Sequence, residues 1–390
     1  MTDENEPGVE NGEGSTQEEQ EENEGVNMTE EYTKRKTPTF TVNESAEPMP
    51  QRNTGGRDIV IYGDSGKTKD LTTVHNFNNY DEALIALGPE DEDNKLLNSI
   101  KEVLTEGSTS SVDSNMGIGI IYAINVGTNP TLEDYKTAIE STKRFKSIRH
   151  ELYLDFYVST ETKELLENIS SIIEELEDKG LYRIAGFTID NSAEDLKTAD
   201  EIKLLNSDVK NSRVYIHVDP KMQSKFIAKT ASCPFFISPA YGTYNSVTSE
   251  EILPYNDDDR EILAQNGFIS DMEGITDSNK AEPCMDWSTS SSLNEADSRL
   301  HARILADEHA SAVDKIIQRY IKANNEENNL ILIEEYSKSY LDTQVEDKKL
   351  KGYGFELTQD PNDSDGIIVK LSLNVLGAII NVTINRRIEY

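Results

Sequence analysis

The sequence has few of the residues that build disulfide scaffolds, metal sites and membrane spans. Its 390 residues include two cysteines, Cys233 and Cys284, which are far apart and lack metal-ligand spacing, so both are predicted to be free thiols. No apolar run approaches the roughly 18 residues of a membrane-spanning helix, and the N-terminus lacks the pattern of a signal peptide. We therefore expect a protein made in the cytoplasm that does not insert into a membrane.

Basic residues are also scarce. There are 38 Lys and Arg against 73 Asp and Glu, which gives a formal net charge of −35. Nucleic-acid phosphates and anionic lipid surfaces both attract Lys and Arg, so this balance argues against nucleic acid and membrane partners. The hydrophobic content of 36% is lean, but a chain of this length can still form two or three domains with buried cores.

The N-terminal part divides into a tail and an arm. Residues 1–33 hold twelve acidic residues and no Lys or Arg, a composition typical of a disordered tail. Residues 34–55 form an arm and linker, in which Phe40 and Val42 belong to a short extended segment with prolines on both sides. We predict that this segment is an N-terminal arm.

Residues 56–295 alternate between apolar strand patterns and amphipathic helix patterns. The predicted strands cover residues 57–62, 118–126, 152–158, 182–188, 213–218 and 234–238, and the predicted helices cover 80–87, 93–106, 131–146, 160–179, 193–205 and 222–230. Such alternation implies βαβ crossovers and a sheet with helices on both faces. The sequence therefore predicts an α/β domain over this range.

Residues 296–390 predict a smaller α+β core domain. Ser298 is expected to cap a long helix that runs to about Ala323. Residues 330–341 fit either a second helix or a short strand followed by a helix, and the pattern does not separate the two. A terminal hairpin closes the domain.

The last stretch carries two apolar alternations with the period of a strand. Ile367, Val369, Leu371, Leu373 and Val375 share the first face, and Ile380, Val382, Ile384, Ile388 and Tyr390 share the second, which only Arg386 interrupts. A strand with one apolar face needs a sheet edge. It either pairs within its own subunit or adds to the sheet of a neighbouring subunit, and the pattern alone leaves both alternatives open.

One motif suggests nucleotide binding. Gly66, Lys67 and Thr68 follow a strand and match the end of a phosphate-binding loop, but Ile61 stands where the first glycine of that loop is required. The residues after the motif include few apolar positions for a buried helix. A nucleotide-binding enzyme that uses these three residues is therefore the alternative function, and a plain turn is the favoured interpretation.

Other candidate sites are weaker still. Of the five histidines, His75, His150 and His217 have no Cys or carboxylate at ligand spacing. His301 and His309 lie two helical turns apart, too far for one metal ion. The acidic run Asp257 to Asp259 does not match a calcium loop and predicts a helix start instead. We expect no catalytic, cofactor or metal site.

The order of these segments resembles the contractile tail sheath proteins of tailed phages, archaeal tailed viruses and related contractile injection machines. The resemblance spans about residues 38–390. It rests on the block 57–88, the strand 118–126, the turn with Leu263, Asn266, Gly267 and Ile269, the MDWSTS segment at 285–290, and the long helix with Gly352, Tyr353 and the hairpin after it. The opening motif that is usual in this family is absent, and TPTFTVNES stands in its place.

The resemblance implies a structural subunit of a virion tail. In such sheaths an α/β domain faces outward, a core domain lines the tail tube, and extended N- and C-terminal arms insert into the sheets of neighbours. The arm residues implied here are Phe40, Val42, Ile380, Val382, Ile384, Ile388 and Tyr390, with the C-terminal arm at about 379–390. The implied partners are further copies in a helical homopolymer, the tail tube protein, and baseplate and tail terminator proteins. Assembly in the host cytoplasm and contraction that drives the tube through an envelope for genome ejection complete this expectation.

Overall fold

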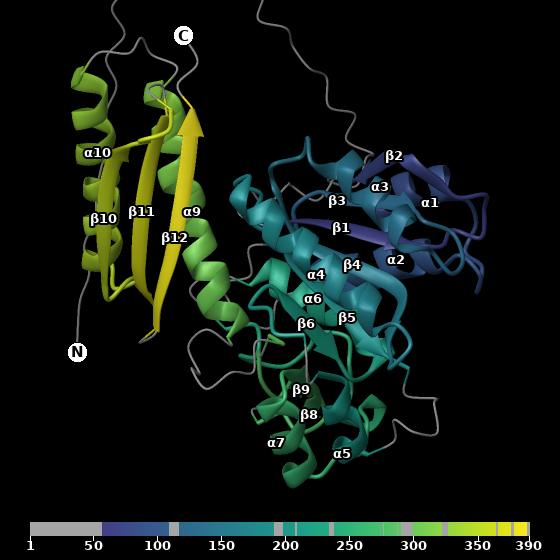
Figure 1. Ribbon diagram of the computed structural model, residues 1–390. Helices are drawn as coiled ribbons and strands as arrows, with labels where there is room; N and C mark the ends of the chain where they lie inside the picture. Colours follow the sequence, from purple (N-terminus) through teal and green to yellow (C-terminus); the bar gives the residue numbers. More distant parts are fainter. Residues whose placement is uncertain are drawn as a thin grey trace, which may run out of the picture. The chain divides into compact units, whose positions relative to one another are not determined.

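The computed structural model describes most of the chain from residue 57 onward (Figure 1). The described residues are 57–108, 117–190, 198–206, 209–233, 238–275, 277–286, 288–289, 299–321, 327–363, 366–375 and 378–387. The predicted acidic tail, Phe40 and Val42 therefore lie outside the described residues, as do Ile388 and Tyr390.

The first half of the described chain forms a seven-stranded sheet with the order β2-β3-β1-β4-β5-β6-β7. All neighbouring pairs are parallel except β2 with β3. The strands are β1 (Asp58–Gly63), β2 (Asp70–Phe77), β3 (Ile121–Asn125), β4 (Ile148–Val158), β5 (Ile184–Ile189), β6 (Val214–His217) and β7 (Phe268–Ile269). Because β1, β3, β5 and β6 are buried on both faces, they appear in the sequence as nearly continuous apolar runs.

Helices cover both faces of this sheet, as the alternation in the sequence predicts. One face packs on α3 (Leu132–Thr142), α4 (Lys163–Asp178), α5 (Ala199–Ile202) and α7 (Asp257–Gln265). The other packs on α1 (Tyr80–Leu87), α2 (Lys95–Ser108) and α6 (Gln223–Ser232). The predicted α/β architecture is confirmed for this part of the chain.

Local signals fix several helix ends. Thr131 accepts a hydrogen bond from the Asp134 amide, and the Asp134 carboxylate accepts one from the Thr131 amide, which forms the capping box of α3. Beyond α4, the amides of Gly180 and Leu181 donate to Glu177 and Leu176 at 2.8 and 2.9 Å. Gly180 adopts a φ of 72°, the left-handed region that glycine occupies without strain.

The C-terminal part has two long helices on a three-stranded antiparallel sheet (Figure 1). Its elements are α9 (Leu300–Ile321), α10 (Glu327–Glu346), β10 (Gly352–Gln359), β11 (Gly366–Val375) and β12 (Ala378–Arg387). The segment 330–341, which the sequence left between helix and strand, is helical. An α+β composition is therefore present, while the predicted domain limits stay predictions.

The long helix α9 belongs to two cores. Leu300 and Ile304 pack in a cluster with residues of β5 and β6, whereas Leu305, Val313 and Ile317 pack against the C-terminal sheet. The helix start also differs from the prediction. Ser298 lies outside the described residues, and the cap that the structure shows is Asp286, whose carboxylate accepts from the amide of His301 at 3.0 Å.

Four strand regions were absent from the prediction, and one of them is the two-residue strand β7. The strand predicted at 234–238 lies outside the described residues except for Ser238. β2 lies at an edge with mostly exposed or half-buried residues, so it lacks an apolar run. β10 alternates half-buried and exposed residues and contains two glycines. A short pair, β8 (Asp271–Glu273) and β9 (Ala281–Pro283), lies in the region expected to hold loops and short helices.

Candidate functional site

The C-terminal sheet buries one face completely. The five alternating residues of β11, from Ile367 to Val375, are at most 1% exposed, and they pack against α9 and α10. Between them lie Ile368, Lys370, Ser372 and Asn374, which are exposed or half-buried. The period-two pattern of the sequence therefore identified both the strand and its buried face.

The strand β12 pairs with β11 along its whole length within the same chain. The ladder is antiparallel and runs from Gly366 opposite Arg387 to Val375 opposite Ala378. Val382 and Ile384 are 3% and 2% exposed and complete the apolar layer, and Ile380 lies opposite Leu373 in the ladder. Of the two alternatives that the sequence left open, the single chain thus shows the first, in which the strand closes on its own subunit.

The arm residues of the prediction have different outcomes. Ile380, Val382 and Ile384 lie on β12, whereas Phe40, Val42, Ile388 and Tyr390 lie outside the described residues. A single chain does not test pairing between copies, so insertion of either arm into a neighbouring subunit stays a prediction.

Arg386 is the residue that interrupts the apolar face of β12, and its partner lies on α9. Its guanidinium forms an ion pair with Asp314, and the two side chains are 18% and 9% exposed. Gln318 donates to the other carboxylate oxygen of Asp314 at 2.6 Å and so holds it in place. The sequence marked Arg386 only as an exception, because nothing local indicates a partner 72 positions earlier in the chain.

Beside this pair lies the end of α4. A Cβ atom on Gly180 would lie 2.6 Å from Nη2 of Arg386, so a larger residue there would make the guanidinium move from its present position. The carboxyl end of a helix carries partial negative charge, which favours a cation at this position. Burial raises the pKa of the neighbouring Tyr182, and Asp307 and Asp314 add to this effect.

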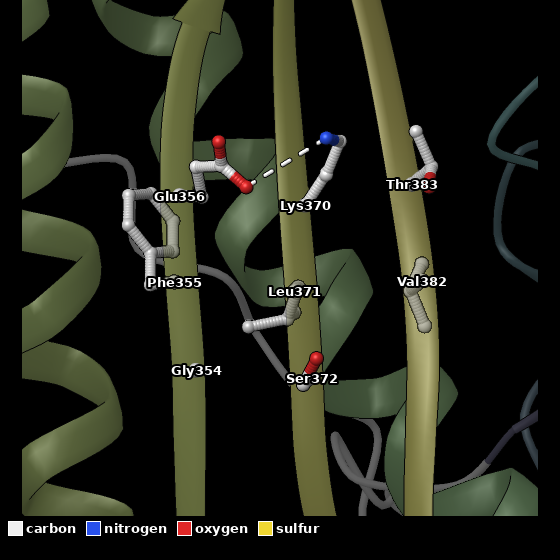
Figure 2. Close-up of a pocket in the computed structure, with 8 residues that line it drawn as sticks. All are labelled: Gly354, Phe355, Glu356, Lys370, Leu371, Ser372, Val382 and Thr383. Atoms are coloured by element: carbon white, nitrogen blue, oxygen red, sulfur yellow. Dashed lines mark ion pairs between the residues drawn. The ribbon is translucent and has the colours of Figure 1, made fainter.

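The opposite edge of the sheet is less completely covered. Tyr353, Phe355 and Leu357 of β10 pack against the core but remain partly exposed. On the polar face, a hollow of about 320 Å³ lies over Gly354, Ser372 and Thr383. Figure 2 shows it beside Glu356 and Lys370, whose charged groups are 3.7 Å apart. The hollow contains one exposed ion pair and no buried polar group, so it has no feature of a ligand site.

Arginines bind α9 to the α/β part of the chain. Arg213 makes two hydrogen bonds with Asp307, at 2.6 and 2.8 Å, and a third with Glu177 at 2.7 Å. Arg57 pairs with Glu308 at 3.1 Å. Burial opposes ionisation of Glu177, but Arg213 and Arg303 outweigh it and lower the pKa of this carboxyl to about 2. The buried pair of Arg213 and Asp307 and the partly buried pair of Arg57 and Glu308 hold the helix against the larger sheet through specific geometry.

His309 makes the packing of α9 against α10 sensitive to pH. Its Nδ1 lies 2.9 Å from the Tyr340 hydroxyl, and burial lowers its pKa from 6.5 to about 4. The His309 imidazole therefore binds a proton more readily in the unfolded chain than in the folded protein. As a result, the free energy of unfolding decreases as the pH falls from about 6.5 towards 4.

We expect His309→Gln to weaken this pH dependence. The wild type should lose about 3 kcal/mol of unfolding free energy between pH 7 and pH 4 through this residue, which the variant lacks. Urea unfolding at pH 7, 5.5 and 4 measures the difference. His75→Gln is the control, since His75 lies on the exposed edge strand β2. Equal pH slopes for the wild type and His309→Gln would contradict the assignment.

The motif with Gly66, Lys67 and Thr68 does not have the geometry of a phosphate-binding loop. The chain continues from it into the strand β2, whereas such a loop leads into a helix whose first amides bind phosphate. The Gly66 amide already donates to Asp64 at 2.9 Å, and Lys67 donates to the Ala86 carbonyl at 3.4 Å. Gly66, Lys67 and Thr68 therefore do not form the phosphate-binding loop on which the alternative function was based.

The acidic run Asp257 to Asp259 begins α7, as predicted. Asn256 accepts from the Asp259 amide at 2.9 Å and completes a capping box. Within the described ranges, no three His, Cys, Asp or Glu side chains are grouped so that they could hold a metal ion. Among the helices of the described part, none has the length and apolar character to cross a membrane.

Comparisons with known proteins agree on one fold. No protein-family model matches the sequence, and no curated protein matches it significantly. Among solved structures, a sheath tail protein from Listeria innocua matches with a TM-score of 0.62 and 11% identity, over 86% of this chain and 96% of that one. A sheath tail protein from Desulfitobacterium hafniense matches with a TM-score of 0.59 and 11% identity, over 90% and 100%.

A third match is a chain of the anti-feeding prophage helical sheath in its contracted state. Its TM-score is 0.58 and its identity 10%, over 90% of this chain and 96% of that one. The chain therefore has the fold of the sheath tail proteins of contractile injection systems, and the resemblance seen in the sequence is confirmed at the level of the fold.

Proposed function

We propose that this chain is the sheath subunit of a contractile injection machine. The observation that carries the proposal is the extent of the fold match, which covers 86–90% of this chain and nearly all of each sheath protein compared. A match of this extent includes more than the α/β sheet, whose architecture many unrelated proteins share. The proposed role is structural, and it assigns no reaction to the chain.

In this proposal the subunits assemble by strand exchange. A β12 that leaves its own subunit and pairs with β11 of a neighbour keeps its ladder of main-chain hydrogen bonds, and its alternate side chains fix the register. A head-to-tail contact of this kind builds an open helical polymer. Ladder bonds also survive while rigid bodies rotate against one another, which is what contraction requires.

The proposed partners follow from this role. The sheath surrounds a tail tube protein, begins at a baseplate and ends at a tail terminator protein. The arm around Phe40 and Val42 supplies a second connection between copies. Location in a virion tail, assembly in the host cytoplasm and genome ejection are the corresponding proposals for its biology.

Negative-stain microscopy of the purified full chain tests the proposal. The protein is incubated alone and with the tail tube protein of the same machine, and we expect hollow helical tubes in the second sample at least. An unrelated tube protein is the control, and it should support no assembly. A subunit that stays monomeric at high concentration with its tube partner would contradict the proposed function.

A further inference from the structure

The ion pair of Arg386 and Asp314 suggests a role beyond the stability of one subunit. The pair joins three elements: β12 supplies the arginine, α9 the carboxylate, and the end of α4 the glycine that leaves room for the guanidinium. Apart from this arginine, the described inner-face residues of β12, Val382 and Ile384, make only apolar contacts with the core. Arg386 is therefore the polar feature by which the surrounding structure can recognise this strand.

The position of Arg386 fixes the register of the strand. It lies opposite Ile367, and Ile384 lies opposite Val369. A shift by one residue would turn Val382 and Ile384 towards the polar face. A shift by two residues would keep the apolar face inward but would separate Arg386 from Asp314, for example by bringing Ile384 to Asp314, and leave both charges without their partner. The apolar side chains alone do not exclude the second shift, whereas the ion pair does.

The free subunit already forms the ladder, the apolar contacts and the ion pair of this recognition site with its own strand. A second copy has the same strand, so it would make the same ladder, the same apolar contacts and the same ion pair in exchange. Exchange of identical elements between copies has little net cost for this reason. Before exchange, however, β12 must leave β11 of its own subunit, and that step breaks the ladder and the ion pair together.

The geometry points to a recognition site for the β12 strand of a second copy. Asp314, Gly180 and Tyr182 form this site, and it binds Arg386 of the incoming strand. In the free subunit the same site is occupied in cis, which keeps β12 closed until assembly. The ion pair thus specifies which strand is accepted and in which register. This inference rests on the proposed function, because it names the residues that govern the proposed exchange.

Charge reversal separates pairing within a copy from pairing between copies. Arg386→Asp and Asp314→Arg each place like charges together, so each variant alone should form tubes at about a tenth of the wild-type yield or less. In an equal mixture, Arg386 of the Asp314→Arg variant can pair with Asp314 of the Arg386→Asp variant. In the reverse contact, the introduced aspartate at position 386 can pair with the introduced arginine at position 314. We expect the mixture to regain tube formation, and the double variant R386D/D314R to form tubes by itself. Tube mass is measured by sedimentation and microscopy.

Two controls accompany this experiment. Lys203→Glu reverses an exposed charge on the α/β part and should leave tube yield unchanged. Arg386→Lys keeps the charge but loses the planar guanidinium, so it should give an intermediate yield. Circular dichroism and size-exclusion chromatography show whether each variant folds as a monomer.

Disulfide cross-linking between copies tests the same proposal if a charge variant fails to fold. Lys370 and Thr383 lie opposite each other in the ladder, and both are exposed on the polar face. Copies with Lys370→Cys are assembled with copies that carry Thr383→Cys. Exchange between copies predicts disulfide-linked dimers in oxidised tubes, and each variant alone should give none.

The outcomes distinguish failure of the recognition site from failure of the sheath function. If R386D/D314R forms tubes but the mixture of single variants does not, and the cysteine mixture gives no linked dimers, the ion pair acts only within a copy and the recognition site is refuted, while the sheath function stands. If the wild type forms no tubes with its tube partner, the proposed function itself fails. Restored assembly in the mixture, or linked dimers, supports the recognition site.

Discussion

Glu151→Ala should cost this protein about 3 to 5 kcal/mol of unfolding free energy, because it leaves a buried arginine without its counter-charge. Arg183 and Glu151 are fully buried in the α/β core, where Nη1 and Oε1 lie 2.6 Å apart. Arg183 also donates to the side chain and the carbonyl of Thr142, at 2.8 and 2.9 Å. The guanidinium would keep these two acceptors in the variant, but its charge would remain uncompensated.

Two tyrosines depend on the same carboxylate. Tyr153 donates to Glu151 at 2.5 Å, and Tyr62 donates to it at 3.5 Å. Burial raises the pKa of both hydroxyls, and the charge of Glu151 adds to this effect, so both stay protonated and remain donors. Removal of the carboxylate therefore also leaves the buried Tyr153 hydroxyl in need of an acceptor, whereas the Tyr62 hydroxyl keeps Oγ1 of Thr142 at 3.3 Å.

Urea unfolding at pH 7 measures this effect, with two comparisons. Asp200→Ala removes an exposed carboxylate and should change the unfolding free energy by less than about 0.5 kcal/mol. The double variant Glu151→Leu/Arg183→Met removes both charges and should recover much of the loss, because apolar residues of similar volume often replace a buried ion pair well. A loss below about 1 kcal/mol for Glu151→Ala would show that the pair is not buried as described.

Deletion of residues 378–390 should abolish tube formation by the truncated protein alone. The deletion removes β12, and with it the ladder partners of Leu371, Leu373 and Val375. In the proposed lattice, such a copy can accept a strand from a neighbour but has none to donate. We therefore expect truncated copies to stop growth, so that a small fraction mixed with the full chain shortens the tubes.

The test compares tube lengths in micrographs at increasing fractions of truncated protein. Deletion of residues 2–33, the acidic tail, is the matched control and should leave tube length unchanged. If the truncated protein does not fold by itself, a synthetic peptide of residues 378–390 should restore its circular dichroism spectrum when added. Normal tubes from truncated copies alone would show that β12 is not the connection between subunits.

Sequence periodicity determined the local structure of this protein well. The period-two alternation of Ile367 to Val375 specified the strand and its buried face, because successive side chains of a strand point to opposite sides. The helical spacing and Gly180 specified α4 and its end, and the acidic start specified α7. These features depend on residues within a few positions of one another, so the sequence carries them directly.

The tertiary structure alone decided the contacts between distant segments. The partner of Arg386 is Asp314, the cap of α9 is Asp286, and α9 is held to the larger sheet by Arg213 through Asp307, 94 positions away. Edge strands such as β2 escaped detection because a strand with little burial needs no apolar run. Charge pairs of this kind leave no local pattern, since each partner alone looks like an ordinary charged residue until the fold brings the two together.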